Sequence, residues 1–110
     1  MRSDYVSIQP LLENRRYARV HGPFEAWRLG DVPAELEIVD LNIGGCFVRE
    51  IPQPGAPLTY SLLIEVGEDG MIEVIAAVLY QRDDGSAVTF LNLSQQAFER
   101  IRRTVERGTR

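Results

Sequence analysis

The sequence has no lysine, one histidine, one cysteine and no long apolar run. A single cysteine excludes an intrachain disulfide, so a reducing compartment is the natural expectation. No apolar stretch approaches the length of a membrane span, and the first residues lack the charged-then-apolar layout of a signal peptide. We therefore expect a cytoplasmic protein that does not insert into a membrane.

Groups that perform catalysis are also scarce. His21 is the only histidine, so a Ser-His-Asp triad would depend on it, and its Gly-Pro neighbours favour a loop. No set of histidine, cysteine and carboxylate residues has metal-ligand spacing. Cys46 lies in a β-rich stretch, which favours a buried structural thiol over a nucleophile. The sequence therefore predicts a protein that is not an enzyme and has no cofactor.

All twelve basic residues are arginine, against sixteen acidic residues and a net charge of −4. This acidic balance argues against a general nucleic-acid binder, whose affinity needs an excess of cations over phosphate contacts. The arginines gather near the two ends of the chain. Because the guanidinium fork matches phosphate oxygens and the guanine edge, they predict a local anion site, unless they reflect only the codon bias of a GC-rich genome.

Length and turn signals predict one small β-rich domain. The 110 residues, 45% of them hydrophobic and 25% charged, suit a single packed core. Turn residues rich in Gly, Pro and Asp separate about six strand-like segments, a layout typical of a small barrel or sandwich. The expected strands cover residues 24–29, 33–39, 46–51, 57–66, 71–82 and 86–91.

The end of the chain changes to a helical period. Phe98, Ile101 and Val105 are three and four residues apart, with charged residues between them, so one apolar stripe should pack on the β-domain. The residues expected to limit this helix are Asn92 or Ser94 at its start and Gly108 at its end.

Two short stretches carry the most specific signal. The first is an Arg-x-x-x-Arg pattern, and the second is Asp-x-Asn-x-x-Gly. In this order and spacing they resemble the split signature of the PilZ domain family, Arg-x-x-x-Arg followed by Asp/Asn-x-Ser-x-x-Gly. The residues concerned are Arg15, Arg16 and Arg19 in the first stretch and Asp40, Asn42 and Gly45 in the second.

The resemblance covers roughly residues 14 to 105 and implies a fold. That fold is mainly β: a PilZ-like, split-barrel type of six-stranded antiparallel β-barrel with a C-terminal α-helix. The expected boundaries are an N-terminal arm at 1–13, a single PilZ-like domain at 14–107 and a tail at 108–110. The family binds the bacterial second messenger cyclic di-GMP, so the resemblance implies a signal-transduction receptor that relays to an effector protein, as yet unidentified.

The resemblance also implies roles for the motif residues. Arg15 and Arg19 would hold phosphate oxygens or the O6 and N7 atoms of guanine, with Arg16 assisting. Asp40 would accept hydrogen bonds from guanine N1–H and N2–H₂, and Gly45 would let backbone and ligand approach closely.

Asn42 stands where the family usually has Ser and is the main departure from the pattern. Its amide can both donate and accept, but its larger side chain can crowd a base. The alternative is therefore a degenerate PilZ-like domain that does not bind cyclic di-GMP and acts as a protein-interaction module in type IV pilus or motility machinery.

Other readings of the same residues stay open or are excluded. Asp40 and Gly45 also fit a plain strand-connecting turn. A calcium loop is excluded, because Leu41 and Ile43 are apolar, Gly44 replaces a ligand, and Ile51 stands where such a loop needs its closing Glu. Each of Trp27 and Tyr80 is expected in the core rather than stacked on a base. The sequence leaves the oligomeric state open.

Overall fold

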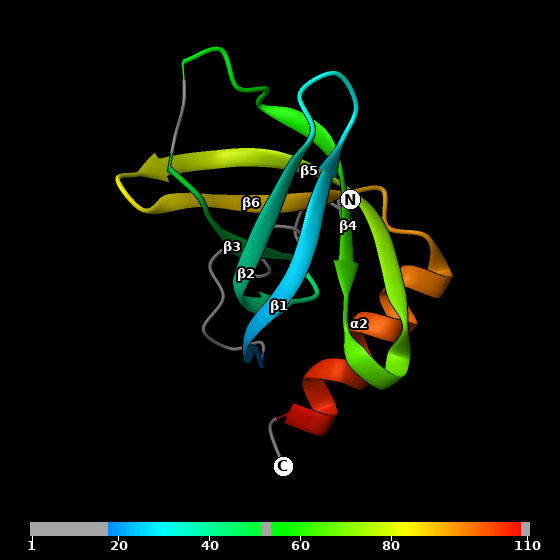
Figure 1. Ribbon diagram of the computed structural model, residues 1–110. Helices are drawn as coiled ribbons and strands as arrows, with labels where there is room; N and C mark the ends of the chain where they lie inside the picture. Colours follow the sequence, from blue (N-terminus) through cyan, green and yellow to red (C-terminus); the bar gives the residue numbers. More distant parts are fainter. Residues whose placement is uncertain (1–17, 52–53, 109–110) are drawn as a thin grey trace, which may run out of the picture.

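The computed structural model describes residues 18–51 and 54–108, in which six strands close a barrel with one helix beside it (Figure 1). Neighbouring strands are antiparallel, and the order around the barrel is β1-β2-β3-β6-β5-β4, with β4 pairing back to β1. The predicted barrel is confirmed. Its strands are β1 (Val20–Leu29), β2 (Ala34–Asn42), β3 (Gly45–Arg49), β4 (Thr59–Glu65), β5 (Met71–Arg82) and β6 (Gly85–Leu91).

Alternating apolar side chains fill the barrel. On β4, Tyr60, Leu62 and Ile64 are buried while the residues between them face outward. Ile38 of β2 and Val48 of β3 meet them with no exposed surface. Burying one such aliphatic side chain contributes roughly 1.5–3 kcal/mol relative to leaving it exposed. The period-2 pattern of the sequence therefore both forms the strands and closes the barrel around its core.

The helix α2 (Gln95–Gly108) packs on the barrel beside the β4–β5 hairpin (Figure 1). At its start, Ser94 Oγ accepts a hydrogen bond from the N–H of Ala97 at 3.0 Å, so Ser94 is the cap. Near its end, Asp69 of η1 (Gly67–Asp69) accepts hydrogen bonds from Thr104 Oγ1 at 2.9 Å and Arg107 Nη1 at 2.6 Å. The Arg107 guanidinium lowers the pKa of Asp69, and Thr104 adds to this effect.

Phe98 does not belong to the buried stripe that the sequence predicts. Its side chain is 38% exposed, whereas Ala97, Ile101 and Val105 are buried. The buried stripe of the helix therefore begins at Ala97, which lies on the same helix face as Ile101 four residues later. Phe98, one residue further along, is turned toward the edge of that face.

The first strand begins earlier than Phe24, and the expectation that His21 lies in a loop is wrong. β1 starts at Val20, and His21 pairs with Asp40 of β2. The Gly22-Pro23 signal marks an irregularity in the pairing between His21 and Phe24 and not the end of the strand. This early start places the residue before β1, Arg19, next to β2.

Candidate ligand-binding site

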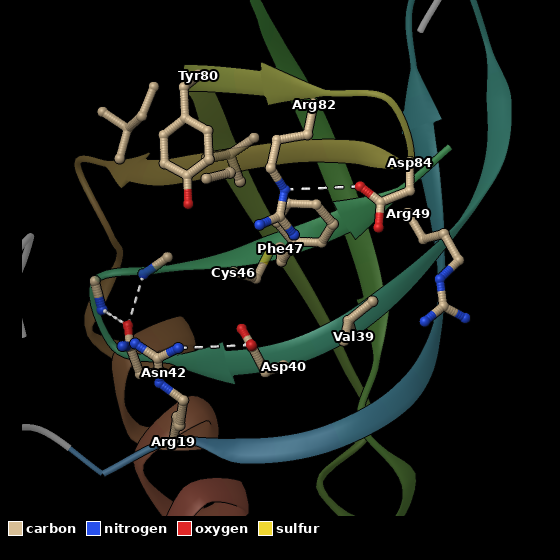
Figure 2. A pocket seen from close by; sticks show the side chains of 15 residues that line it. Arg19, Val39, Asp40, Asn42, Cys46, Phe47, Arg49, Tyr80, Arg82 and Asp84 are labelled. Carbon is tan, nitrogen blue, oxygen red and sulfur yellow. Dashed lines mark hydrogen bonds and ion pairs between the residues drawn. The ribbon is translucent and has the colours of Figure 1, made fainter. Parts of the chain in front are cut away.

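A cleft of about 360 Å³ lies on the outer face of the four neighbouring strands β2, β3, β6 and β5 (Figure 2). A line of cross-strand partners runs through it, from Asp40 through Phe47 and Ala87 to Tyr80. Gly45, the next outward position of β3, adds no side chain. Beside Phe47, the small residues Gly45 and Ala87 leave room in the middle of the cleft, and larger polar side chains lie at its two sides.

Asp40 reaches this face because β2 contains a bulge. The pairing with β3 shifts between Ile38 and Asp40, which leaves Val39 as an extra residue. Ile38 and Leu41 are both fully buried although they are three residues apart, an odd spacing that a regular strand does not allow. Asp40 therefore points out of the barrel, into the cleft.

Arg19 meets Asp40 at one side of the cleft. Its Nη1 atom lies 3.6 Å from Asp40 Oδ2, as the dashed line in Figure 2 shows, and the two side chains are 46% and 23% exposed. An exposed ion pair of this length contributes only about 0–1 kcal/mol to stability. Each of the two side chains can therefore leave this ion pair and bind a ligand instead, at little cost in stability.

Asn42 fixes the turn that joins β2 to β3. Its Oδ1 accepts hydrogen bonds from the N–H groups of Gly44 at 2.7 Å and Gly45 at 2.9 Å. The carbonyl oxygen of the side chain is thus engaged by the backbone, and the side chain is largely buried while still lining the cleft. Only its Nδ2 donors are left for other partners.

Gly45 is required by the barrel itself. A Cβ atom at this position would overlap Val88 O on the adjacent strand β6 and also crowd the Cα of Thr89. The missing side chain therefore permits close pairing of β3 with β6. The role in ligand approach that the family resemblance implies remains a prediction, although Gly45 does line the cleft.

The opposite side of the cleft is formed by the end of β5. Tyr80 is 54% exposed there, which makes the expectation that it fills the core wrong. The Arg82 guanidinium carbon lies 4.7 Å from the ring centre of Phe47, and its Nε is 3.7 Å from Asp84 Oδ1. Figure 2 shows Tyr80 and Arg82 on this side and Arg19 and Asp40 on the other.

The cleft gathers several arginine side chains in a chain that is acidic overall. Three arginines and two aspartates line it. The third arginine, Arg49, pairs with Glu37 through Nη1 and Oε1 at 2.7 Å. All three guanidinium groups are about half exposed and each is paired with one carboxylate, so an anionic ligand can bind them by replacing these partners.

The structure brings four of the six sequence-predicted site residues together: Arg19, Asp40, Asn42 and Gly45 all line the cleft. Arg15 and Arg16 lie outside the described residues. Phe47, Tyr80 and Arg82 were not predicted, because their arrival on this face depends on strand register, which no local pattern reveals.

Cys46 lies in the core as expected, whereas the expectation that Trp27 fills the core is wrong, because Trp27 faces outward between the buried Ala26 and Arg28. The Cys46 thiol is buried behind the cleft, and burial raises its pKa, with a smaller contribution from the Asp40 carboxylate. It is therefore a protonated core residue, as predicted. Trp27 is half-buried on β1 and lies outside the cleft.

Within the described part of the chain, no helix is long and apolar enough to cross a membrane. Among the same residues, no three or more His, Cys, Asp or Glu side chains are grouped as a metal site would need.

The sequence analysis did not predict one buried cation, Arg28 of β1. Its side chain donates hydrogen bonds to Glu50 Oε2 at 3.1 Å and to Val32 O at 2.8 Å. The bond to Val32 lies within the β1–β2 hairpin, and the bond to Glu50 links β1 to the residue that follows β3.

Comparison with solved structures identifies proteins that have a similar fold. Neither a protein-family model nor a curated protein sequence matches the chain. The PilZ domain of YcgR from Escherichia coli, solved with cyclic di-GMP, is similar over 88% of this chain and 92% of its own, with a TM-score of 0.69 and 16% identity.

Two longer structures are also similar. MotI/DgrA, the inhibitor of motility of Bacillus subtilis, matches 86% of this chain with a TM-score of 0.72 and 13% identity. YcgR of Escherichia coli in complex with cyclic di-GMP matches 86% with a TM-score of 0.64 and 19% identity. The chain spans about half of the first protein and 45% of the second. The described barrel and its helix therefore have the fold of a PilZ domain.

Proposed function

We propose that the protein is a receptor that binds cyclic di-GMP in this cleft and relays the signal to a partner protein. The observation that carries the proposal is the meeting of Arg19 with Asp40 and Asn42 at one side of an open cleft. These residues come from two stretches about twenty positions apart in the sequence. The similarity to PilZ domains solved with cyclic di-GMP supports the same ligand.

Each group in the cleft matches a part of this ligand. The Asp40 carboxylate accepts from guanine N1–H and N2–H₂, and the Arg19 guanidinium donates to a phosphate or to guanine O6 and N7. Asn42 contributes its Nδ2 donors, because Oδ1 already accepts from the turn. In the proposal Arg15 and Arg16 add two further guanidinium groups, as in the family pattern.

Signal relay follows from what the ligand replaces. The Arg19–Asp40 ion pair stands at the start of β1, next to residues that a partner protein can reach. In the proposal, the ligand breaks the Arg19–Asp40 ion pair: Arg19 then pairs with a phosphate, and Asp40 accepts from a guanine. The surface around the first residues of the barrel then differs between the free and the bound receptor, which is the difference a partner reads.

Calorimetric titration of the full chain with cyclic di-GMP tests the proposal, with GTP and linear diguanylate as control ligands. We expect saturable binding of the cyclic form alone. Replacing Arg19 with Ala should cost roughly 1.5–3 kcal/mol of binding free energy, or about tenfold to a hundredfold in affinity. Arg103→Ala is the matched control, because Arg103 is an exposed arginine of α2 and lines none of the cleft.

A second candidate is a PilZ-like interaction module that no longer binds the ligand. The engagement of Asn42 Oδ1 by Gly44 and Gly45 favours it, because a side-chain acceptor is then withdrawn from the ligand. The titration separates the two candidates. Neither heat nor a thermal shift at high concentrations of cyclic di-GMP would support the interaction module and contradict the receptor.

A further inference from the structure

We infer that Tyr80 and Arg82 form a second base subsite, on the side of the cleft opposite Asp40, that holds one guanine of the ligand by stacking. This inference rests on the proposed function and extends it. The motif residues that the structure describes supply side chains on one side of the cleft, whereas the other side belongs to the end of β5 (Figure 2). That side presents the exposed phenol ring of Tyr80 and the planar guanidinium of Arg82, on which a base can stack.

A second bulge aims these groups into the cleft. On β5, Val78 pairs with Val88 but Tyr80 pairs with Ala87, so Leu79 is an extra residue. Val88 is buried in the barrel, and Ala87 lines the cleft on the outer face. Val74 and Ala76 are buried, so regular alternation along β5 would point Tyr80 into the barrel as well. The bulge instead turns Tyr80 to the outer face of the sheet. A bulge that re-aims one side chain is typical of a functional surface.

The two bulges act on the same line of residues. One turns Asp40 outward on β2, and the other turns Tyr80 outward on β5, at the two ends of the line that passes through Phe47 and Ala87. Three strand spacings separate the ends, which is about 14 Å along the sheet. A ligand with two bases on opposite sides of a ribose-phosphate ring can occupy both ends. A mononucleotide has only one base and fills one end.

Arg82 is held in a position that favours stacking. Its guanidinium lies over the Phe47 ring, with its carbon 4.7 Å from the ring centre, and Asp84 forms a longer, exposed ion pair with its Nε at 3.7 Å. Gly85 makes room for this arrangement, because a Cβ there would lie 2.8 Å from the Phe47 ring. A planar cation fixed on an aromatic ring leaves its other face available to a base, and its remaining N–H groups available to phosphate. Base stacking on Tyr or Arg is a common way to bind nucleotides.

The test compares the affinity of cyclic di-GMP for Tyr80→Phe, Tyr80→Leu and Arg82→Ala. Tyr80→Leu keeps an apolar side chain but removes the aromatic face, so it should lower the affinity about fivefold to a hundredfold. Tyr80→Phe keeps the face and should stay within about twofold of wild type, and Arg82→Ala should lose about tenfold. Ile75→Leu is the control, because Ile75 is exposed on the same strand but lies outside the cleft.

A spectroscopic signal separates stacking from a general loss of shape. In the wild type and in Tyr80→Phe, the guanine H8 resonance of bound ligand should move upfield under the ring current, and in Tyr80→Leu this shift should disappear. Normal binding by Tyr80→Leu and Arg82→Ala would overturn the second subsite while the proposed function stands. Absence of binding by the wild type would overturn both.

Discussion

The backbone N–H of Gly45 donates a hydrogen bond to Asn42 Oδ1 at 2.9 Å, which joins two residues that the sequence marks as ligand contacts. The same oxygen accepts from Gly44 N–H at 2.7 Å. Asn42 is therefore a structural residue of the β2–β3 turn in the free protein. In the proposed receptor, its position in the cleft beside Asp40 would also let its Nδ2 donate to the ligand.

Replacing Asn42 with Ala should destabilise the fold by about 1–3 kcal/mol, because two backbone N–H groups lose their acceptor. Asn42→Asp keeps the acceptor oxygens, so its stability should stay close to that of the wild type. Its extra negative charge should nevertheless weaken binding of cyclic di-GMP. Urea unfolding and calorimetric titration measure the two effects, and equal stability of the Ala and Asp variants would contradict the role in the turn.

Asn42→Ser tests the departure from the family pattern. The Ser hydroxyl can accept one turn hydrogen bond and leaves more room for a base, so we expect slightly lower stability and tighter binding, by up to about tenfold. Calorimetric titration decides this point. Weaker binding by the Ser variant would show that the amide of Asn42 is itself a useful ligand contact.

Gly45→Ala should be more damaging than a surface substitution. The added methyl group would overlap Val88 O, and the backbone of β6 can yield only by breaking its pairing with β3. Overpacking of this kind costs about 1–3 kcal/mol, and more where backbone must move. Thermal unfolding without ligand measures it. A wild-type midpoint together with lost binding would instead assign Gly45 to the ligand.

Much of the fold could be predicted because local signals agree with it. Turn residues such as Gly67 and Gly70 mark the β4–β5 hairpin, and the spacing of Ile101 and Val105 marks the helix face. The bulges at Val39 and Leu79 could not be predicted, because a bulge breaks the alternation from which strands are recognised. The half of the site that contains Tyr80 was missed for this reason.

The helix face gives a matched pair of core variants. Ile101→Ala should destabilise the protein by about 2–5 kcal/mol, because it leaves a cavity under α2. Phe98→Ala should cost about 1 kcal/mol or less, since 38% of that side chain is exposed. Urea unfolding of both variants decides the point. Equal losses would contradict the helix orientation described above.

Attachment of the helix to η1 should depend on pH. The pKa of Asp69 is lowered in the folded state, chiefly by Arg107, so its contribution is complete above the unfolded pKa of about 4 and is lost as pH falls through the folded pKa. Asp69→Asn should destabilise the protein at pH 7 and the difference should shrink below about pH 4. Unfolding curves at pH 7 and pH 3 measure this. A difference independent of pH would contradict an ionic role for Asp69.

The most direct test of the central claim is an NMR titration of the ¹⁵N-labelled full chain with cyclic di-GMP. The proposed site predicts large, saturable shifts for the amides of Gly44, Gly45 and Ala87, which line the cleft, and small shifts for Glu106 on α2, which lies outside it. No shift at saturating ligand, or shifts confined to α2, would contradict binding in the cleft.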